Sequence, residues 1–213
     1  SHGISIPTKF IFSIDLGTSL FEEISKIKSI KILVQKLMQV HNISAEIDIE
    51  TSFNNINISP TEKEHHILRL TTSCLASIIG GAKRWIMNDE DAVFNGDYWK
   101  KISCNIPIIL KEESSVLNNV DVTIGNHVVN NITNKLCNSA WQHFKHIEKD
   151  GGFKNSCSNG NFQSIVEKYQ VERINQLKNN NSSYIGFNVY TKDKPSLHFD
   201  KKLNNPIKLK DLI

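Results

Sequence analysis

Cysteine is scarce in this sequence, and no cysteine is placed to build a zinc site. The four cysteines are widely spaced, without a C-x-x-C motif or a Cys/His pair at zinc spacing: Cys74, Cys104, Cys137 and Cys157. Cys74 and Cys137 fall on apolar faces of predicted helices. We therefore expect buried free thiols, which are typical of the cytoplasm.

Long hydrophobic runs and an excess of one charge are also absent. No apolar run approaches the length of a membrane span, and no signal-peptide pattern is present. The 25 basic and 22 acidic residues are interspersed and give a net charge of +3, so nothing favours a nucleic-acid or membrane partner. The 213 residues suffice for one ordinary domain with its own core. Because the chain begins Ser1-His2-Gly3 without Met, we expect it to be part of a longer polypeptide.

The first half of the sequence alternates predicted strands with predicted helices. Each helix has a recognisable start or stop: Ser19 and Glu22 have capping-box spacing, Ser59-Pro60 begins the second helix, and Gly80-Gly81 ends it. Pro107 should kink the third helix. The predicted strands are 10–16, 45–50 and 83–87, and the predicted helices are 19 to about 41, 59–80 and 98–113. Three strand–helix repeats predict parallel strands in a βα architecture.

The second half of the sequence is predicted to be mainly helical. One apolar stripe runs from Val129 to Ile147 and ends at Gly151-Gly152, and a second helix covers 162–178. Residues 184–191 are predicted to form a short strand or an extended arm. We place the boundary near Ser115–Asp121, so that residues 1–115 carry the βα units and residues 116–213 the helical segment and tail.

The stretch 68–113 resembles the last βα unit of the barrel in cobalamin-dependent methylmalonyl-CoA mutases. Its features occur in the family's order: a helix with Arg69 and Thr71-Thr72, the Gly80-Gly81 stop, an Asp-Glu loop, and a helix ending Ile109-Leu110-Lys111-Glu112-Glu113. Gly186–Tyr190 is similar to the family's Gly-x-Asn-x-Tyr, and the resemblance covers about Thr8 to Tyr190. It implies an α/β fold: the C-terminal portion of a TIM-type (β/α)8 barrel, about three βα units, followed by a mainly helical segment.

The functional residues of that family carry over poorly. Lys9 aligns with an Arg that contacts the CoA substrate, and Glu50 replaces a Gln before Thr51-Ser52. Lys9, Glu50, Thr51 and Ser52 are therefore the candidates for contacting a CoA thioester. Further departures from the family are Phe53-Asn54 in place of Gly-Trp, Asp121–His127 in place of Asp-Pro-x-Gly-Gly-Ser-Tyr, and the absence of the cobalt-binding Asp-x-His-x-x-Gly motif from all 213 residues. We expect no catalytic residue, no cofactor and no metal on this chain.

This combination resembles the small, non-catalytic subunit of a heterodimeric methylmalonyl-CoA mutase. The resemblance implies a catalytic large subunit as partner, with adenosylcobalamin bound by that partner, in the cytoplasm. Two alternatives remain open. The chain could belong to an active acyl-CoA mutase whose catalytic half lies upstream, with Lys9 and Glu50 as altered substrate contacts. It could also be an independent binding or scaffolding module.

An acidic strand offers a second candidate site. Glu46, Asp48 and Glu50 alternate with apolar residues and should point to one face. One hypothesis is a metal site completed by His65 or His66; we favour a polar strand face that looks into a barrel lumen or solvent. Three carboxylates in a row would repel CoA phosphates. We interpret His143 and His146 as a solvated helix flank, the loop Asp89-Glu90-Asp91 as structural, and Trp85, Trp99 and Trp141 as core or interface residues.

Overall fold

The computed structural model of the chain describes residues 7–53, 63–86, 97–116, 121–179, 181–186 and 188–190. The predicted helix start at 59–62, the loop 89–91, Asn54 and the tail beyond 190 lie outside these residues. The elements, in chain order, are β1 (Lys9–Leu16), α1 (Leu20–Val40), β2 (Glu46–Phe53), α2 (Lys63–Gly80), β3 (Arg84–Ile86), α3 (Asp97–Glu112), α4 (His127–Lys149), α5 (Gly152–Ser158) and α6 (Asn161–Lys178).

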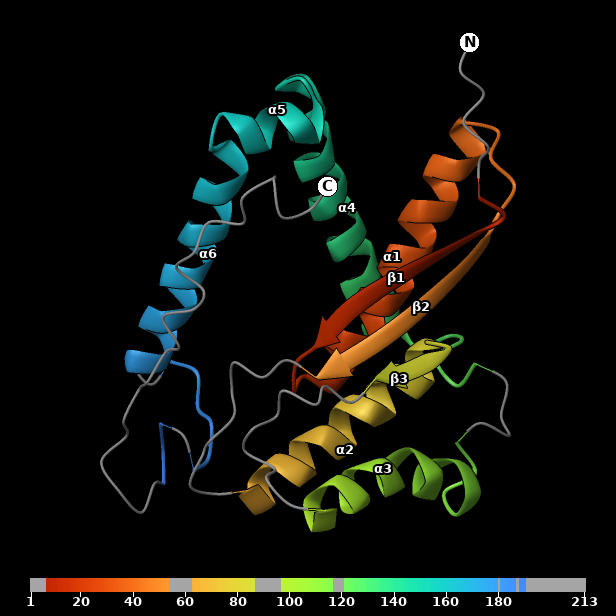
Figure 1. Cartoon of the computed structure of the whole chain (residues 1–213), viewed down its shortest axis with the longest axis vertical. Helices are drawn as coiled ribbons and strands as arrows, with labels where there is room; N and C mark the ends of the chain where they lie inside the picture. Colours follow the sequence, from red (N-terminus) through yellow and green to blue (C-terminus); the bar gives the residue numbers. More distant parts are fainter. Residues whose placement is uncertain are drawn as a thin grey trace. The chain divides into compact units, whose positions relative to one another are not determined.

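The three strands form one parallel sheet in the order β1-β2-β3 (Figure 1). β2 pairs with β1 along its full length, from Lys9 opposite Glu46 to Leu16 opposite Phe53. β3 is short and pairs Arg84 with Glu50 and Ile86 with Ser52. Each connection between neighbouring strands contains a helix, as parallel pairing requires. The predicted α/β class with parallel strands is therefore confirmed.

Helices α1 and α2 cover one face of this sheet, and that face is apolar. Leu16, Ile27 and Ile49 are at most 1% exposed and form one cluster, which joins both strands to α1. A second cluster joins β2 to α2 and α3 through Phe53, Leu70, Cys74, Ile106 and Leu110. Trp85 packs against both clusters, as predicted for a core residue. Fully burying one Leu or Ile side chain contributes about 1.5–3 kcal/mol, so this layer is the main stabilising element of the sheet.

The helix boundaries follow the sequence signals with two exceptions. Gly81 ends α2 with φ of 78°, a conformation that glycine adopts without penalty. Ser19 is the N-cap of α1, but its side chain makes no capping hydrogen bond, so the capping-box prediction is wrong in that detail. Pro107 lies inside α3, as expected. The short helix α5 was not predicted from the sequence.

Residues 184–186 and 188–190 belong to a turn, and the prediction of a strand or extended arm there is wrong. The amide nitrogens of Asn188 and Val189 both donate to the carbonyl oxygen of Tyr184. Asn188 holds the turn together: its side-chain oxygen accepts from the Tyr184 amide at 2.7 Å, and its side-chain nitrogen donates to the carbonyl oxygens of Leu177 and Ser182. These local bonds replace the pairing that an extended strand would need.

Contacts divide the chain into two compact units within α4. The first unit comprises Ser1–Asn55 and Glu62–Ala140, and the second comprises Ile56–Thr61 and Trp141–Ile213. The first contains the whole sheet and α1 to α3. In the second, Trp141 stacks on Phe144 with ring centroids 5.2 Å apart, and Phe153 packs edge-on against Phe162 at 5.1 Å. No helix of the described residues is long and apolar enough to cross a membrane.

Substituting Gly80 with Ala should destabilise the first unit. A Cβ atom at Gly80 would lie 2.7 Å from Cδ1 and 3.0 Å from Cβ of Ile27, which is fully buried and has no room to move. We expect the free energy of unfolding to fall by about 1–3 kcal/mol, measured by urea denaturation. Leu68→Ala on the same helix is the control, because Leu68 is 67% exposed and its truncation should change stability by less than about 0.5 kcal/mol. Equal stability of G80A and the parent chain would contradict the close packing of α1 on α2.

Candidate functional site: the polar face of the sheet

The second face of the sheet is mainly polar, with Ile11 and Ile86 as its exposed apolar members, and every strand contributes to it. Side chains alternate along a strand, so the register places these residues on the face opposite the helices. We call this set the polar face: Lys9, Ser13, Asp15, Glu46, Asp48, Glu50, Ser52 and Arg84, together with Lys83, whose side chain reaches Asp48 from just before β3.

Asp48 is the centre of an ion-pair cluster that links β1 and β2 to Lys83. Its Oδ2 lies 2.6 Å from Nζ of Lys9, and its Oδ1 lies 2.5 Å from Nζ of Lys83. Both lysines also contact the carboxylate of Glu46. The hydrogen bonds from Lys83 and Lys9 lower the pKa of Asp48 to about 2. The same contacts raise the pKa of Lys83.

Further along the strands, Glu50 and Ser52 are also engaged within the chain. Nε of Arg84 lies 3.4 Å from the carboxylate of Glu50, and the hydroxyl of Ser13 donates to the same carboxylate. The hydroxyl of Ser52 donates to Asp15 on β1. Three cations on the polar face therefore oppose the three carboxylates of β2. Whether the three carboxylates of β2 repel CoA phosphates remains a prediction, because each of them pairs with a neighbouring cation.

The four predicted substrate contacts do not form one site. Thr51 lies on the helix face and is 1% exposed; its hydroxyl bonds to the hydroxyl of Ser77 at 2.6 Å and to the carbonyl oxygen of Arg84 at 3.3 Å. Lys9 is paired with Glu46 at the amino end of the sheet, whereas Ser52 lies six residues further along, about 20 Å away. Only Glu50 and Ser52 share both a face and an end of the sheet. Whether either contacts a substrate remains a prediction.

The hypothesis of a metal site on the acidic strand is wrong, because the histidines lie on the other side of the sheet. His66 is fully buried in α2 and packs edge-on against Phe53, with ring centroids 4.9 Å apart. Burial, with repulsion from Arg69, lowers the pKa of His66 to about 4. Within the described ranges, no group of three or more His, Cys, Asp or Glu residues could hold a metal ion.

The predicted solvated flank on α4 has partners that the sequence did not suggest. His146 lies 3.7 Å from a carboxylate oxygen of Asp150, and His143 lies 3.5 Å from the hydroxyl of Tyr169. Both histidines are exposed, as expected. The expectation of buried thiols is confirmed for Cys74 only, because Cys137 and Cys157 are half-buried and Cys104 is exposed. Burial raises the pKa of Cys74 to about 12, which suits an inert core thiol.

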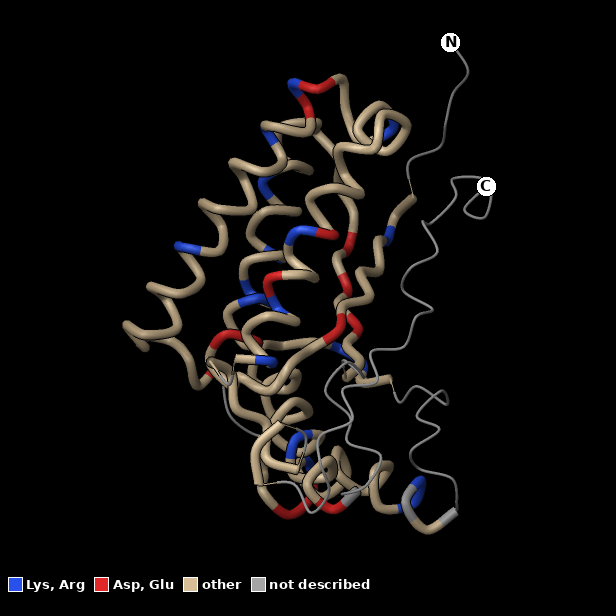
Figure 2. Tube along the Cα trace, turned by 90° about the vertical axis from the view of Figure 1, so that its left-hand side faces the viewer, with Lys and Arg blue, Asp and Glu red and all other residues tan. Residues whose placement is uncertain are grey.

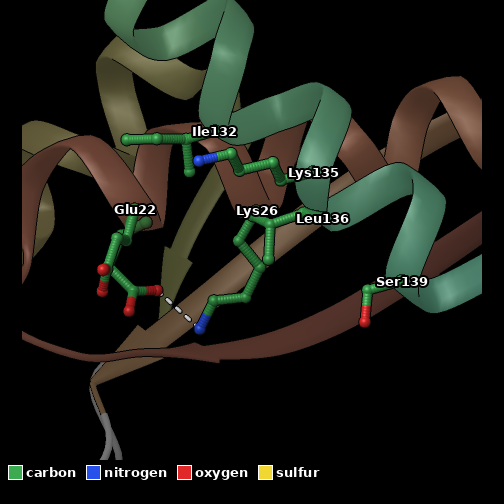
Figure 3. Close-up of a pocket in the computed structure, with 7 residues that line it drawn as sticks. Glu22, Lys26, Ile132, Lys135, Leu136 and Ser139 are labelled. Atoms are coloured by element: carbon green, nitrogen blue, oxygen red, sulfur yellow. Dashed lines mark ion pairs between the residues drawn. The ribbon is translucent and has the colours of Figure 1, made fainter.

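A groove of about 480 Å³ lies between the first turns of α1 and the first half of α4 (Figure 3). Glu22, Glu23 and Lys26 line one side, and the α4 residues Ile132, Lys135, Leu136 and Ser139 line the other. Lys26 is already engaged: its Nζ lies 2.5 Å from Glu23 and donates to the carbonyl oxygen of Asp15 at 2.8 Å. The groove therefore belongs to the helix layer and is separate from the polar face.

Asp121 has a structural role that was not predicted from the sequence. Its carboxylate accepts hydrogen bonds from the amide and hydroxyl of Thr123 at 2.9 and 2.5 Å, and Nζ of Lys28 lies 2.7 Å away. Although partial burial acts to raise it, these bonds hold the pKa of Asp121 at about 2. Asp121 thus ties the turn before α4 to α1. Short Asp-x-Thr spacing is the sequence signal that could have indicated this turn.

Comparison with known proteins identifies the family of the chain. The family model for methylmalonyl-CoA mutase matches residues 5–210. This chain belongs to the methylmalonyl-CoA mutase family. It is 22% identical over 192 residues to the methylmalonyl-CoA mutase small subunit of Porphyromonas gingivalis, covering 87% of this chain and 31% of that protein.

Other relatives carry different subunit names. The chain is 24% identical over 187 residues to the methylmalonyl-CoA mutase of Rhizobium meliloti, covering 85% of the chain and 26% of the relative. It is 22% identical over 181 residues to the methylmalonyl-CoA mutase large subunit of Porphyromonas gingivalis, covering 82% of the chain and 25% of that protein. The chain therefore spans about a quarter to a third of the length of these relatives, and the family is clear while the subunit type is not decided by identity.

The residues of the chain do not fit the cobalamin that is associated with this mutase family. The Asp-x-His-x-x-Gly motif is absent from the sequence. His66 is enclosed between α2 and the sheet, and no histidine lines the α1–α4 groove. No step of any reaction is therefore assigned to cobalamin on this chain.

The buried hydroxyls of Thr51 and Ser77 should contribute more to the free energy of unfolding as a hydrogen-bonded pair than as two separate groups. Thr51→Val leaves the hydroxyl of Ser77 buried without its partner, so we expect a loss of about 1–3 kcal/mol in the free energy of unfolding. Ser77→Ala in the same chain should recover part of that loss, with a coupling of about 0.5–1.5 kcal/mol in a double-mutant cycle by urea denaturation. Ser52→Ala, one residue away on the polar face, is the matched control. Strictly additive effects of T51V and S77A would rule out the bond.

Proposed function

We propose that this chain is part of the small, non-catalytic subunit of a heterodimeric methylmalonyl-CoA mutase. The complex would interconvert methylmalonyl-CoA and succinyl-CoA, with adenosylcobalamin held by the catalytic large subunit. The role of this chain would be to stabilise that partner. Its three strands would be the C-terminal βα units of a (β/α)8 barrel, whose remaining strands lie outside this chain.

One observation carries this proposal: the positions that resemble substrate contacts are used within the chain itself. Lys9 is paired with Asp48, Glu50 with Arg84, Ser52 with Asp15, and Thr51 is buried against α2. A CoA thioester brings phosphate charges, which need cations that are free to pair with them. On the polar face each of the three cations already has a carboxylate partner. In this proposal the strands and helices of the family are retained, whereas the side chains at the substrate-contact positions bond to other residues of the same chain.

The subunit role is tested by expressing the full-length polypeptide with and without a catalytic mutase chain of the same organism. We expect the two chains to elute together in equal amounts from a size-exclusion column. We also expect turnover of methylmalonyl-CoA only when the catalytic chain is present. A full-length polypeptide that stays monomeric beside that chain would contradict the proposal.

Two variants in the same complex distinguish the proposed role from the alternative of an active acyl-CoA mutase. If Lys9 contacts substrate, Lys9→Met should raise KM by about tenfold or more, since it removes a cation that faces an anionic ligand; if Glu50 contacts substrate, Glu50→Gln, which restores the residue of the family, should lower KM instead. Under the proposed role, KM for methylmalonyl-CoA stays unchanged in both. Turnover by the full-length polypeptide alone, supplied with adenosylcobalamin, would favour the alternative.

A further inference from the structure

Two lysines hold the same carboxylate on the polar face. One oxygen of Asp48 faces Lys9 and the other faces Lys83, at 2.6 and 2.5 Å. The Asp48 side chain is 4% exposed, whereas those of Lys9 and Lys83 are 42% and 52% exposed. The carboxylate is therefore enclosed by two ammonium groups that remain accessible to solvent.

This geometry is one that a phosphate group could also use. Lysine binds phosphate as a point charge, and two ammonium groups that converge on one pair of oxygens provide two charge-assisted hydrogen bonds. The remaining charged groups nearby are Glu46, which contacts both lysines, the Arg84–Glu50 pair one step along β2, and Lys31 of α1, which interacts electrostatically with Asp48 and Lys83. No helix residue contributes an ion pair to this cluster among the described residues.

The contact of two lysines with Asp48 distinguishes the polar face from the other charged positions of the described chain. Figure 2 shows acidic and basic positions interspersed along the described chain. Lys28 and Asp121 form a comparable pair on the helix side, but a single lysine contacts that carboxylate. Asp48 differs from Asp121 in being held by two lysines and in being almost fully enclosed.

We propose that the polar face is an anion-binding site that the chain fills with its own Asp48 carboxylate. Because Asp48 already pairs with both Lys9 and Lys83, these two cations do not bind phosphate-bearing ligands. Removing the negative charge of Asp48 should expose a site for a compact polyanion such as pyrophosphate. The inference rests on the ion pairs of the polar face and does not require the subunit role.

The test compares pyrophosphate binding to the 213-residue chain and to its Asp48→Asn variant by isothermal titration calorimetry at pH 7 and low salt. Asn keeps the shape of Asp without the charge. We expect D48N to bind pyrophosphate about tenfold more tightly than the parent chain, because two ammonium groups lose their internal partner. The double variant Lys9→Met/Asp48→Asn should lose that gain.

Asp121→Asn is the matched control, since it removes one lysine-paired carboxylate from the helix side and changes net charge by the same amount. A folded D48N that binds no better than the parent, or no better than D121N, would overturn the proposal. Circular dichroism establishes whether D48N is folded. If it is not, Glu46→Gln, which alters an exposed carboxylate on the same two lysines, should bind about threefold more tightly, and the absence of any gain there would equally overturn it.

Discussion

The sheet depends on how the charge of Asp48 is satisfied. A parallel sheet normally has both of its faces covered, but the described helices α1 and α2 pack on one face only. The polar groups on the other face must therefore pair with one another. Lys9 from β1 and Lys83 beside β3 do this by converging on Asp48 in the middle strand. Because an enclosed carboxylate without a partner is strongly unfavourable, this contact favours keeping the three segments side by side.

The two faces of β2 have separate structural roles. Residues 47, 49, 51 and 53 face the helices and build the core, so Thr51 has become part of the packing. The alternate residues face the lysines and the arginine. Both sets of contacts stay within the chain.

Much of the fold follows from local sequence patterns. Alternation in Ala45–Glu50 predicts β2 and its polar face, and Gly80-Gly81 predicts the end of α2; both are confirmed. The role of Lys83 could not be predicted, because its contact depends on the register between β2 and β3. The same alternation could have placed Thr51 on the helix face, since it follows Ile47 and Ile49 at two-residue spacing. The turn around Asn188 was missed because the apolar pattern of this stretch resembles a strand, whereas the side-chain bonds of Asn188 decide the structure.

The claim that internal cations satisfy Asp48 is tested most directly by measuring its pKa in the folded chain. Carbon NMR of the side-chain carboxyl, titrated from pH 7 to pH 1.5, gives this value for a single residue. The account predicts a pKa of about 2, so that the stabilising contribution of Asp48 is complete above pH ~4 and is lost as the pH falls toward 2. A pKa near the ordinary value of about 4 would show that Lys9 and Lys83 do not hold the carboxylate, and would contradict the account.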